Sequence, residues 1–151
     1  MDNYRLLKLN VQNQIENIIK LNEHTAAFGL VLSTEDAKLL AAKRRDTLKE
    51  QQRVEFGEGI LPKLIFTFCD SCYIDQNNYV ETIGRLQEIF YQYKNETMDE
   101  LSDDELLESM REAFDGECEG SLEFLEETAM ERLARKLRKR GYGALEEDYE
   151  D

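Results

Sequence analysis

Apolar residues recur every three or four positions along most of the chain, which is the spacing of one face of an α-helix. The periodic segments predict six helices, over residues 10–22, 34–51, 60–69, 78–94, 102–114 and 121–140. Ser33 with Asp36, and Ser102 with Glu105, have the spacing of capping boxes that begin two of these helices. The connections are short. We therefore predict an all-α fold, a single-domain bundle of about six helices with short loops.

Two of the predicted helices carry further signals. The segment over residues 60–69 is so apolar that we expect it to be the buried central helix, with Pro62 in its first turn, where a missing N–H is tolerated. Gly84 lies inside the helix over residues 78–94 and costs about 1 kcal/mol relative to alanine. It marks either a close helix contact or an exposed glycine that the helix tolerates.

The last helix is amphipathic and ends in a basic cluster. Its apolar stripe consists of Leu122, Leu125, Ala129, Leu133 and Leu137. Its cations are Arg132, Arg135, Lys136, Arg138, Lys139 and Arg140. Because the helix macrodipole favours cations near a C-terminus, this cluster needs no ligand. The alternative is a patch for nucleic acid or an acidic protein, masked by the acidic tail that follows Gly141. We assign residues 1–140 to the helical domain and residues 141–151 to this tail.

The negative charge is concentrated in one block. The chain has 33 acidic and 19 basic residues, a net charge of −14. Residues 96–127 hold 14 of the acids and Arg111 as the one base. Such a field repels phosphate backbones, so we expect no nucleic-acid partner and favour a basic protein. The alternative is a solvated acidic face that keeps the protein soluble.

Residues 115–126 have the side-chain order of a twelve-residue calcium loop, with Asp115 at position 1, Gly120 at 6 and Glu126 at 12. The intermediate oxygen-bearing positions are Glu117, Glu119, Ser121 and Glu123. Together with the amphipathic segment before it, the region over residues 101–126 resembles a calmodulin-like EF-hand. The resemblance implies that the loop binds calcium.

Two features depart from the EF-hand pattern. Glu117 and Glu119 stand where the family uses Asp or Asn, and EF-hands usually come in pairs. The other candidate loop, over residues 70–81, has Cys72 at position 3. The alternative is a plain helix–loop–helix whose second helix begins with a Ser121 cap.

The cysteines and the histidine offer a second candidate site. Cys69 and Cys72 form one CxxC pair and, with Cys118 and His24, could supply a Cys₃His zinc site. The alternative is a core residue at Cys69 and a half-exposed thiol at Cys72. His24 lies beside Glu23, but no motif pairs it with a nucleophile, so we expect a solvent-facing residue at a helix end. We commit to no catalytic, cofactor-binding or metal-ligating residue.

The distribution of apolar residues, charges and cysteines also predicts the cellular compartment of the protein. No stretch of 18 apolar residues occurs, and charges are spread over the first thirty positions, so we expect neither a membrane span nor a signal peptide. An odd number of cysteines in a domain of this size fits reduced thiols. We therefore expect a cytoplasmic protein.

Several segments, over residues 53–65, 68–71, 78–82 and 114–118, are similar to a family of short, acidic, uncharacterised bacterial proteins found chiefly in Gram-positive anaerobes. The resemblance spans residues 27–140. It implies a bacterial cytoplasmic protein and brings no activity, cofactor or site residue.

Three functional hypotheses follow. The first is a non-enzymatic helical interaction module that offers the acidic surface of residues 96–127 to a basic partner or self-associates through a helix face. The alternative is a calcium-binding protein that uses residues 115–126. The third is an enzyme whose site is assembled from scattered acids.

Overall fold

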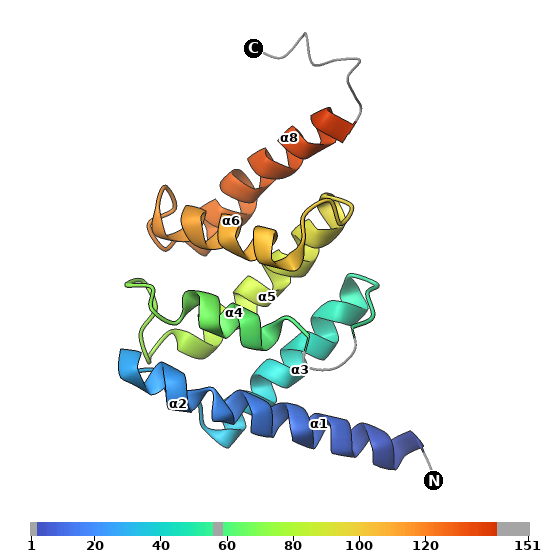
Figure 1. Ribbon diagram of the computed structural model, residues 1–151, viewed down its shortest axis with the longest axis vertical. Coiled ribbons are helices and arrows are strands. Elements are labelled where there is room, and N and C mark those ends of the chain that lie inside the picture. The colour runs from blue at the N-terminus through green and yellow to red at the C-terminus, as the bar shows by residue number, and fades with distance from the viewer. Residues whose placement is uncertain (1–2, 56–58, 142–151) are drawn as a thin grey trace. The chain divides into compact units, whose positions relative to one another are not determined.

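The computed structural model describes residues 3–55 and 59–141, and side chains within residues 11–55 and 59–139. All regular structure in these residues is helical, so the predicted all-α class is confirmed. In the described part of the chain, six helices have eight or more residues (Figure 1): α1 (Asn3–Lys20), α3 (Thr34–Glu50), α4 (Leu61–Phe68), α5 (Tyr79–Glu96), α6 (Asp103–Asp115) and α8 (Met130–Gly141). The shorter helical elements are α2 (Asn22–Thr25), η1 (Ala26–Phe28), α7 (Leu122–Phe124) and η2 (Leu125–Ala129).

Both predicted capping boxes are present. The Asp36 backbone N–H donates to the Ser33 hydroxyl at 3.1 Å, and the Ser33 N–H donates to the Asp36 carboxylate at 3.2 Å. Ser102 and Glu105 make the same reciprocal pair at the start of α6. These contacts satisfy N–H groups that the first turn of a helix leaves unpaired.

The chain divides into two compact units, residues 1–88 and 89–151, which we call unit 1 and unit 2. Helix α5 contributes to unit 1 as far as Glu88 and to unit 2 from Ile89. The predicted tail covers residues 141–151, of which Gly141 is the last residue of α8 and residues 142–151 lie outside the described residues. The predicted division at residues 140 and 141 stays a prediction.

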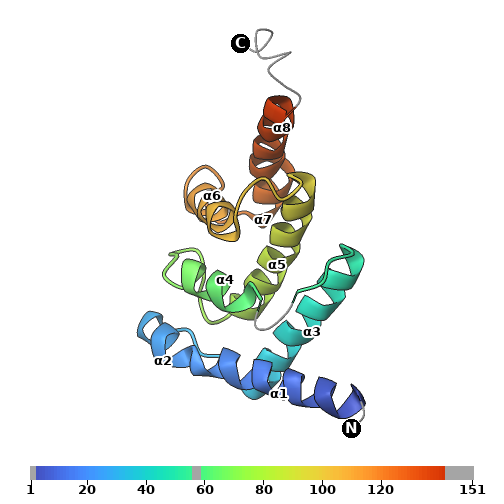
Figure 2. The same cartoon turned by 45° about the vertical axis from the view of Figure 1, so that its right-hand side comes forward.

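In unit 1, α1 packs against α3 and α4 around an apolar interior (Figure 2). Its fully buried side chains include Leu40, Leu64, Ile65 and Phe68. The same interior holds an ion pair, in which the Arg44 Nη2 and Glu55 Oε1 atoms are 3.0 Å apart and the arginine side chain is 5% exposed. A cation is thus part of the core of this unit.

Helix α4, which was expected to be the buried central helix, is buried on one side and exposed on the other. Leu61, Leu64, Ile65 and Phe68 are buried, as their one-face spacing predicts. Phe66 lies on the opposite side and is 48% exposed. An apolar run therefore did not mean burial on every side, because an eight-residue helix at the surface of a unit has an outer face.

The helix that follows Ser121 contains an unpredicted π-helical turn, η2, between α7 and α8. The Met130 N–H donates to the Leu125 carbonyl, five residues earlier, and the extra residue rotates the later positions around the helix. Leu125 and Ala129 are buried as predicted, but Met130 and Ala134 are buried after them and Leu133 is only half-buried. The predicted apolar stripe is therefore wrong at Leu133, whereas Leu137 is buried as predicted.

Candidate protein-interaction surface

Helix α6 presents acids to solvent because its apolar residues are all on its other side. Leu106, Leu107, Met110 and Phe114 are buried in unit 2. Glu105 has a lowered pKa, since its carboxylate accepts hydrogen bonds from Ser102. A helix with this pattern is fixed by one side and leaves the other side free for contacts.

The predicted acidic surface exists: none of the 14 acids in residues 96–127 is buried. They are Glu96, Asp99, Glu100, Asp103, Asp104, Glu105, Glu108, Glu112, Asp115, Glu117, Glu119, Glu123, Glu126 and Glu127. We call these residues the acidic surface. Asp104, Glu108 and Glu112 follow one another at i, i+4 spacing along α6, where like charges destabilise a helix by about 0.2 to 0.5 kcal/mol per pair. The helix thus carries a row of like charges along its exposed side.

The loop predicted to bind calcium has a sharp turn at its centre. Glu119 and Gly120 have positive φ angles of 46° and 81°, and the Gly120 N–H donates to the Phe114 carbonyl at 2.8 Å. Ser121 begins the next helix by accepting a hydrogen bond from the Phe124 N–H, which is the predicted cap.

Two of the predicted calcium ligands are held by arginines. The Arg111 Nε atom lies 2.7 Å from Asp115 Oδ2, and the Arg132 Nη2 atom lies 2.6 Å from Glu117 Oε1. Within the described residues, no three His, Cys, Asp or Glu side chains form a group that could hold a metal ion. The first pair lies within α6, and the second connects the loop to α8.

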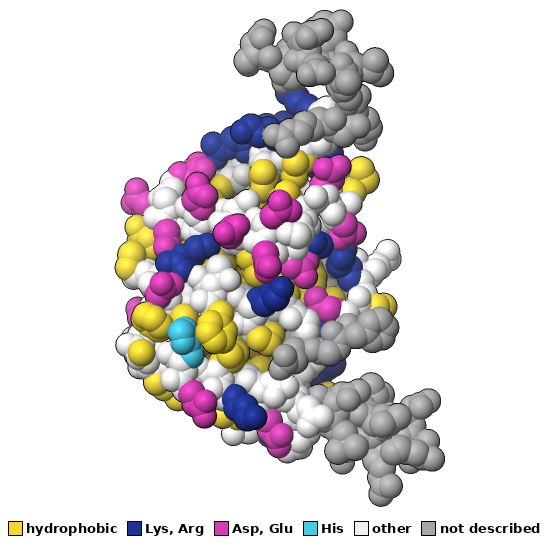
Figure 3. All heavy atoms as spheres, viewed as in Figure 1, with side chains coloured by type: hydrophobic (Ala, Val, Ile, Leu, Met, Phe, Trp, Pro, Cys, Tyr) yellow, Lys and Arg dark blue, Asp and Glu magenta, His cyan; other side chains and the backbone are white. Residues whose placement is uncertain are grey.

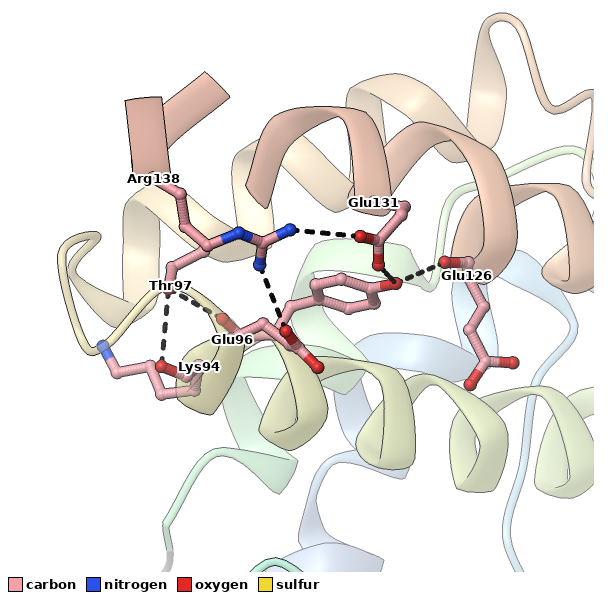
Figure 4. Close-up of polar contacts among 7 residues, drawn as sticks. Lys94, Glu96, Thr97, Glu126, Glu131 and Arg138 are labelled. Carbon is pink, nitrogen blue, oxygen red and sulfur yellow. Dashed lines mark hydrogen bonds and ion pairs between the residues drawn. The ribbon is translucent and has the colours of Figure 1, made fainter. Parts of the chain in front are cut away.

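Tyr93 connects α5 to the π turn inside unit 2. Its hydroxyl donates to the Glu126 carbonyl at 2.5 Å and lies 3.2 Å from the Glu131 carboxylate. Figure 4 shows Arg138 between Glu131 and Glu96, with nitrogen–oxygen distances of 3.3 and 3.2 Å. Burial, followed by the neighbouring carboxylates, raises the pKa of Tyr93 well above its usual value. The phenol therefore remains a donor and holds the π turn in place.

A groove of about 520 Å³ lies between α6 and α8. Its small or apolar lining residues are Ala113, Gly116, Ala129, Met130 and Leu133. Glu112 and Glu117 line it from the α6 side, and Arg132 and Lys136 line it from α8. Figure 3 shows the same segregation, with basic side chains along α8 next to acidic side chains over α6. The helical periodicity of the sequence does not predict this groove, because the π turn rotates Leu133 toward it.

The residues of the predicted zinc site are not assembled as ligands. Cys69 is buried, and its thiol lies 3.5 Å from the Phe66 carbonyl, whereas Cys72 is exposed. Burial and then the charge of Glu117 raise the pKa of Cys118, which disfavours the thiolate that zinc binds. Cys118, like Cys69, is buried.

His24 is exposed near the end of α2, as predicted, and belongs to an aromatic cluster that the sequence did not reveal. Its ring stacks on Phe66 with centroids 4.4 Å apart and meets the edge of Phe28 at 5.8 Å. Figure 3 shows the histidine among apolar side chains at the surface of unit 1. The rings come from segments about forty positions apart, so no local pattern could predict the cluster.

These observations define an all-α protein with a segregated acidic and basic surface on one of its units. Residues 17–143 match the family described as a family of unknown function, DUF6323, and the chain belongs to this family. No curated protein and no solved structure matches the chain. Membership of a family without an assigned activity was predicted and is confirmed. A bacterial source and an EF-hand relationship stay predictions.

None of the helices in the described part of the chain has the length and hydropathy that a membrane-spanning segment requires.

Proposed function

We propose that this protein is a non-enzymatic protein–protein interaction module whose acidic surface binds a basic partner protein. The observation that supports this proposal is that none of the acids in residues 96–127 is buried, with the exposed residues Asp104, Glu108 and Glu112 in a row along α6. A row of like charges lowers the stability of the helix and raises the rate and specificity with which an oppositely charged partner associates.

A basic helical peptide tests the proposal by fluorescence anisotropy at low salt. Neutralising the row with D104N, E108Q and E112Q should weaken binding by about tenfold, since each exposed pair contributes roughly 0.2 to 1 kcal/mol.

A matched control removes the same amount of charge from unit 1. Glu16, Glu35 and Glu50 are all exposed, so E16Q, E35Q and E50Q change the net charge equally. This control should bind the peptide almost as the unmodified protein does. An equal loss in both triple variants would show that the peptide senses only net charge, and would contradict the proposal.

Calcium binding at residues 115–126 is the alternative function, and this geometry does not favour it. Asp115 and Glu117 would have to leave Arg111 and Arg132 before they could coordinate an ion. Calorimetry with calcium tests the alternative. Heat release at millimolar calcium that disappears in D115N would establish it.

A further inference from the structure

We propose that the groove between α6 and α8 is the docking site for an amphipathic helix of the partner, basic along one flank and acidic along the other. The inference rests on the proposed function and specifies the partner's chemistry. Two observations support the docking site, namely the groove itself and the opposite charges of its two rims.

The two rims have opposite charge over matching lengths. Glu108 and Glu112 are one turn apart on α6, and Arg132 and Lys136 are one turn apart on α8. Three of these four side chains line the groove, and all four residues are exposed. Arg132 also pairs with Glu117 in the groove at 2.6 Å, and an acid on a docked helix would share or replace this partner. A turn of α-helix rises about 5.4 Å, so charges at i, i+4 spacing on a docked helix would face both rims in register.

The floor between the rims is made of small or apolar groups. Ala113, Gly116 and Ala129 leave room for larger side chains of an incoming helix, and Leu133 offers an apolar contact. An amphipathic helix that lays its apolar stripe into a groove is a common form of peptide recognition. The charged rims add direction: reversing the helix would place its acidic flank against Glu108 and Glu112.

The opposite charges of the two rims also disfavour a docked helix that is basic on both flanks. A helix that is basic on both flanks would meet Arg132 and Lys136 with like charge, whereas the acidic surface outside the groove would still attract it. Binding in the groove can therefore be separated from binding to the acidic surface as a whole.

Three synthetic helical peptides with the same apolar stripe test the inference. The first has lysines on one flank and glutamates on the other, the second has the same composition with the charges mixed on both flanks, and the third is basic on both flanks. The first should bind about tenfold more tightly than the second, since two or more rim pairs of roughly 0.2 to 1 kcal/mol distinguish them. Equal binding of the first two would overturn the inference.

Four protein variants locate the site. We call the first peptide the segregated peptide and the third the basic peptide. Ala113→Phe fills the groove without changing its charge, so it should abolish tight binding of the segregated peptide and leave binding of the basic peptide unaffected. The double variants E108K, E112K and R132E, K136E should each weaken binding of the segregated peptide by about tenfold. The variant with all four reversals should recover this binding, because the helix can then insert in the opposite direction. Circular dichroism checks that each variant is folded.

A matched charge control is E123K with E127K, at two exposed acids that do not line the groove. It should bind the segregated peptide like the unmodified protein. If Ala113→Phe and the R132E, K136E variant also bind it unchanged, the groove is not the site, and the inference is wrong. Binding of the basic peptide that still depends on Asp104, Glu108 and Glu112 would then leave the proposed function standing. Association of two copies that Ala113→Phe abolishes would assign the groove to a second chain and also overturn the inference.

Discussion

Units 1 and 2 place their charges in different ways. Residues 1–88 have 13 acidic and 11 basic residues, a net charge of −2, whereas residues 89–151 have 20 and 8, a net charge of −12. Unit 1 keeps Arg44 in its interior beside Glu55. In unit 2 every acid of residues 96–127 reaches the surface. An ion pair is thus part of the interior of unit 1, whereas the ion pairs and the remaining acids of residues 96–127 lie at the surface of unit 2.

The largest expected effect comes from the interior ion pair of unit 1. Arg44→Met removes the cation that faces the Glu55 carboxylate and should lower the free energy of unfolding by about 3 kcal/mol, since breaking a buried pair leaves a poorly solvated charge. The matched change in unit 2, Arg111→Met, breaks a more exposed pair with Asp115 and should cost less than about 1 kcal/mol. Urea unfolding followed by circular dichroism measures both. Equal losses would contradict the contrast between the units.

A pH effect of intermediate size should come from Tyr79, whose ring is fully buried in unit 1. Burial is the main cause that raises its pKa to about 12, against about 10 in an unfolded chain. A raised folded pKa gives stability that is present below pH 10 and is lost as the pH rises from 10 toward 12, by about 1 kcal/mol per pH unit. Urea unfolding at several pH values should show a shallower decline for Tyr79→Phe. If the slope of unfolding free energy against pH is the same in Tyr79→Phe, the decline is not caused by Tyr79.

The two buried tyrosines should differ when each loses its hydroxyl at neutral pH. Tyr93 donates to the Glu126 carbonyl, so Tyr93→Phe should cost about 1 kcal/mol. Among the described groups none completes a hydrogen bond with the Tyr79 hydroxyl, although the Thr25 side chain lies nearby. Tyr79→Phe should therefore be neutral or stabilising. Thermal unfolding of both variants checks this, and equal costs would argue against a special role for Tyr93 at the π turn.

The parts of the fold that were predictable from the sequence depend on neighbouring residues. Ser33 with Asp36, and Ser102 with Glu105, satisfy N–H groups of their own first turn, and their spacing is visible without any tertiary contact. The acidic surface was predictable for a related reason, since carboxylates are seldom buried unless they are paired.

The parts that were not predictable depend on contacts between distant segments. The π turn is held by Tyr93, some thirty positions before it, and this turn decides that Ala134 rather than Leu133 is buried. The adjacent apolar residues Ala129 and Met130 were the available signal, because a regular helix seldom buries two neighbours on one narrow stripe. The groove follows from that turn, so it too was missed.

The smallest effect should be a gain of stability at Gly84 in unit 1, where the sequence left a close helix contact and an exposed glycine as alternatives. The residue is buried, and a Cβ atom would meet the Lys43 Cγ atom at 3.7 Å, which is an ordinary contact. Gly84→Ala should therefore raise the free energy of unfolding by about 0.5 to 1 kcal/mol, since glycine lowers helix stability by that amount.

Gly59 is the control in the same unit, because it has a φ angle of +67° and an added Cβ would overlap the Glu55 carboxylate. Gly59→Ala should destabilise the protein, since it strains the backbone and displaces the partner of Arg44. Urea unfolding of both variants should thus give changes of opposite sign. A loss in Gly84→Ala would mean that the aliphatic part of Lys43 cannot move aside, and α5 would then meet α3 more tightly than these distances indicate.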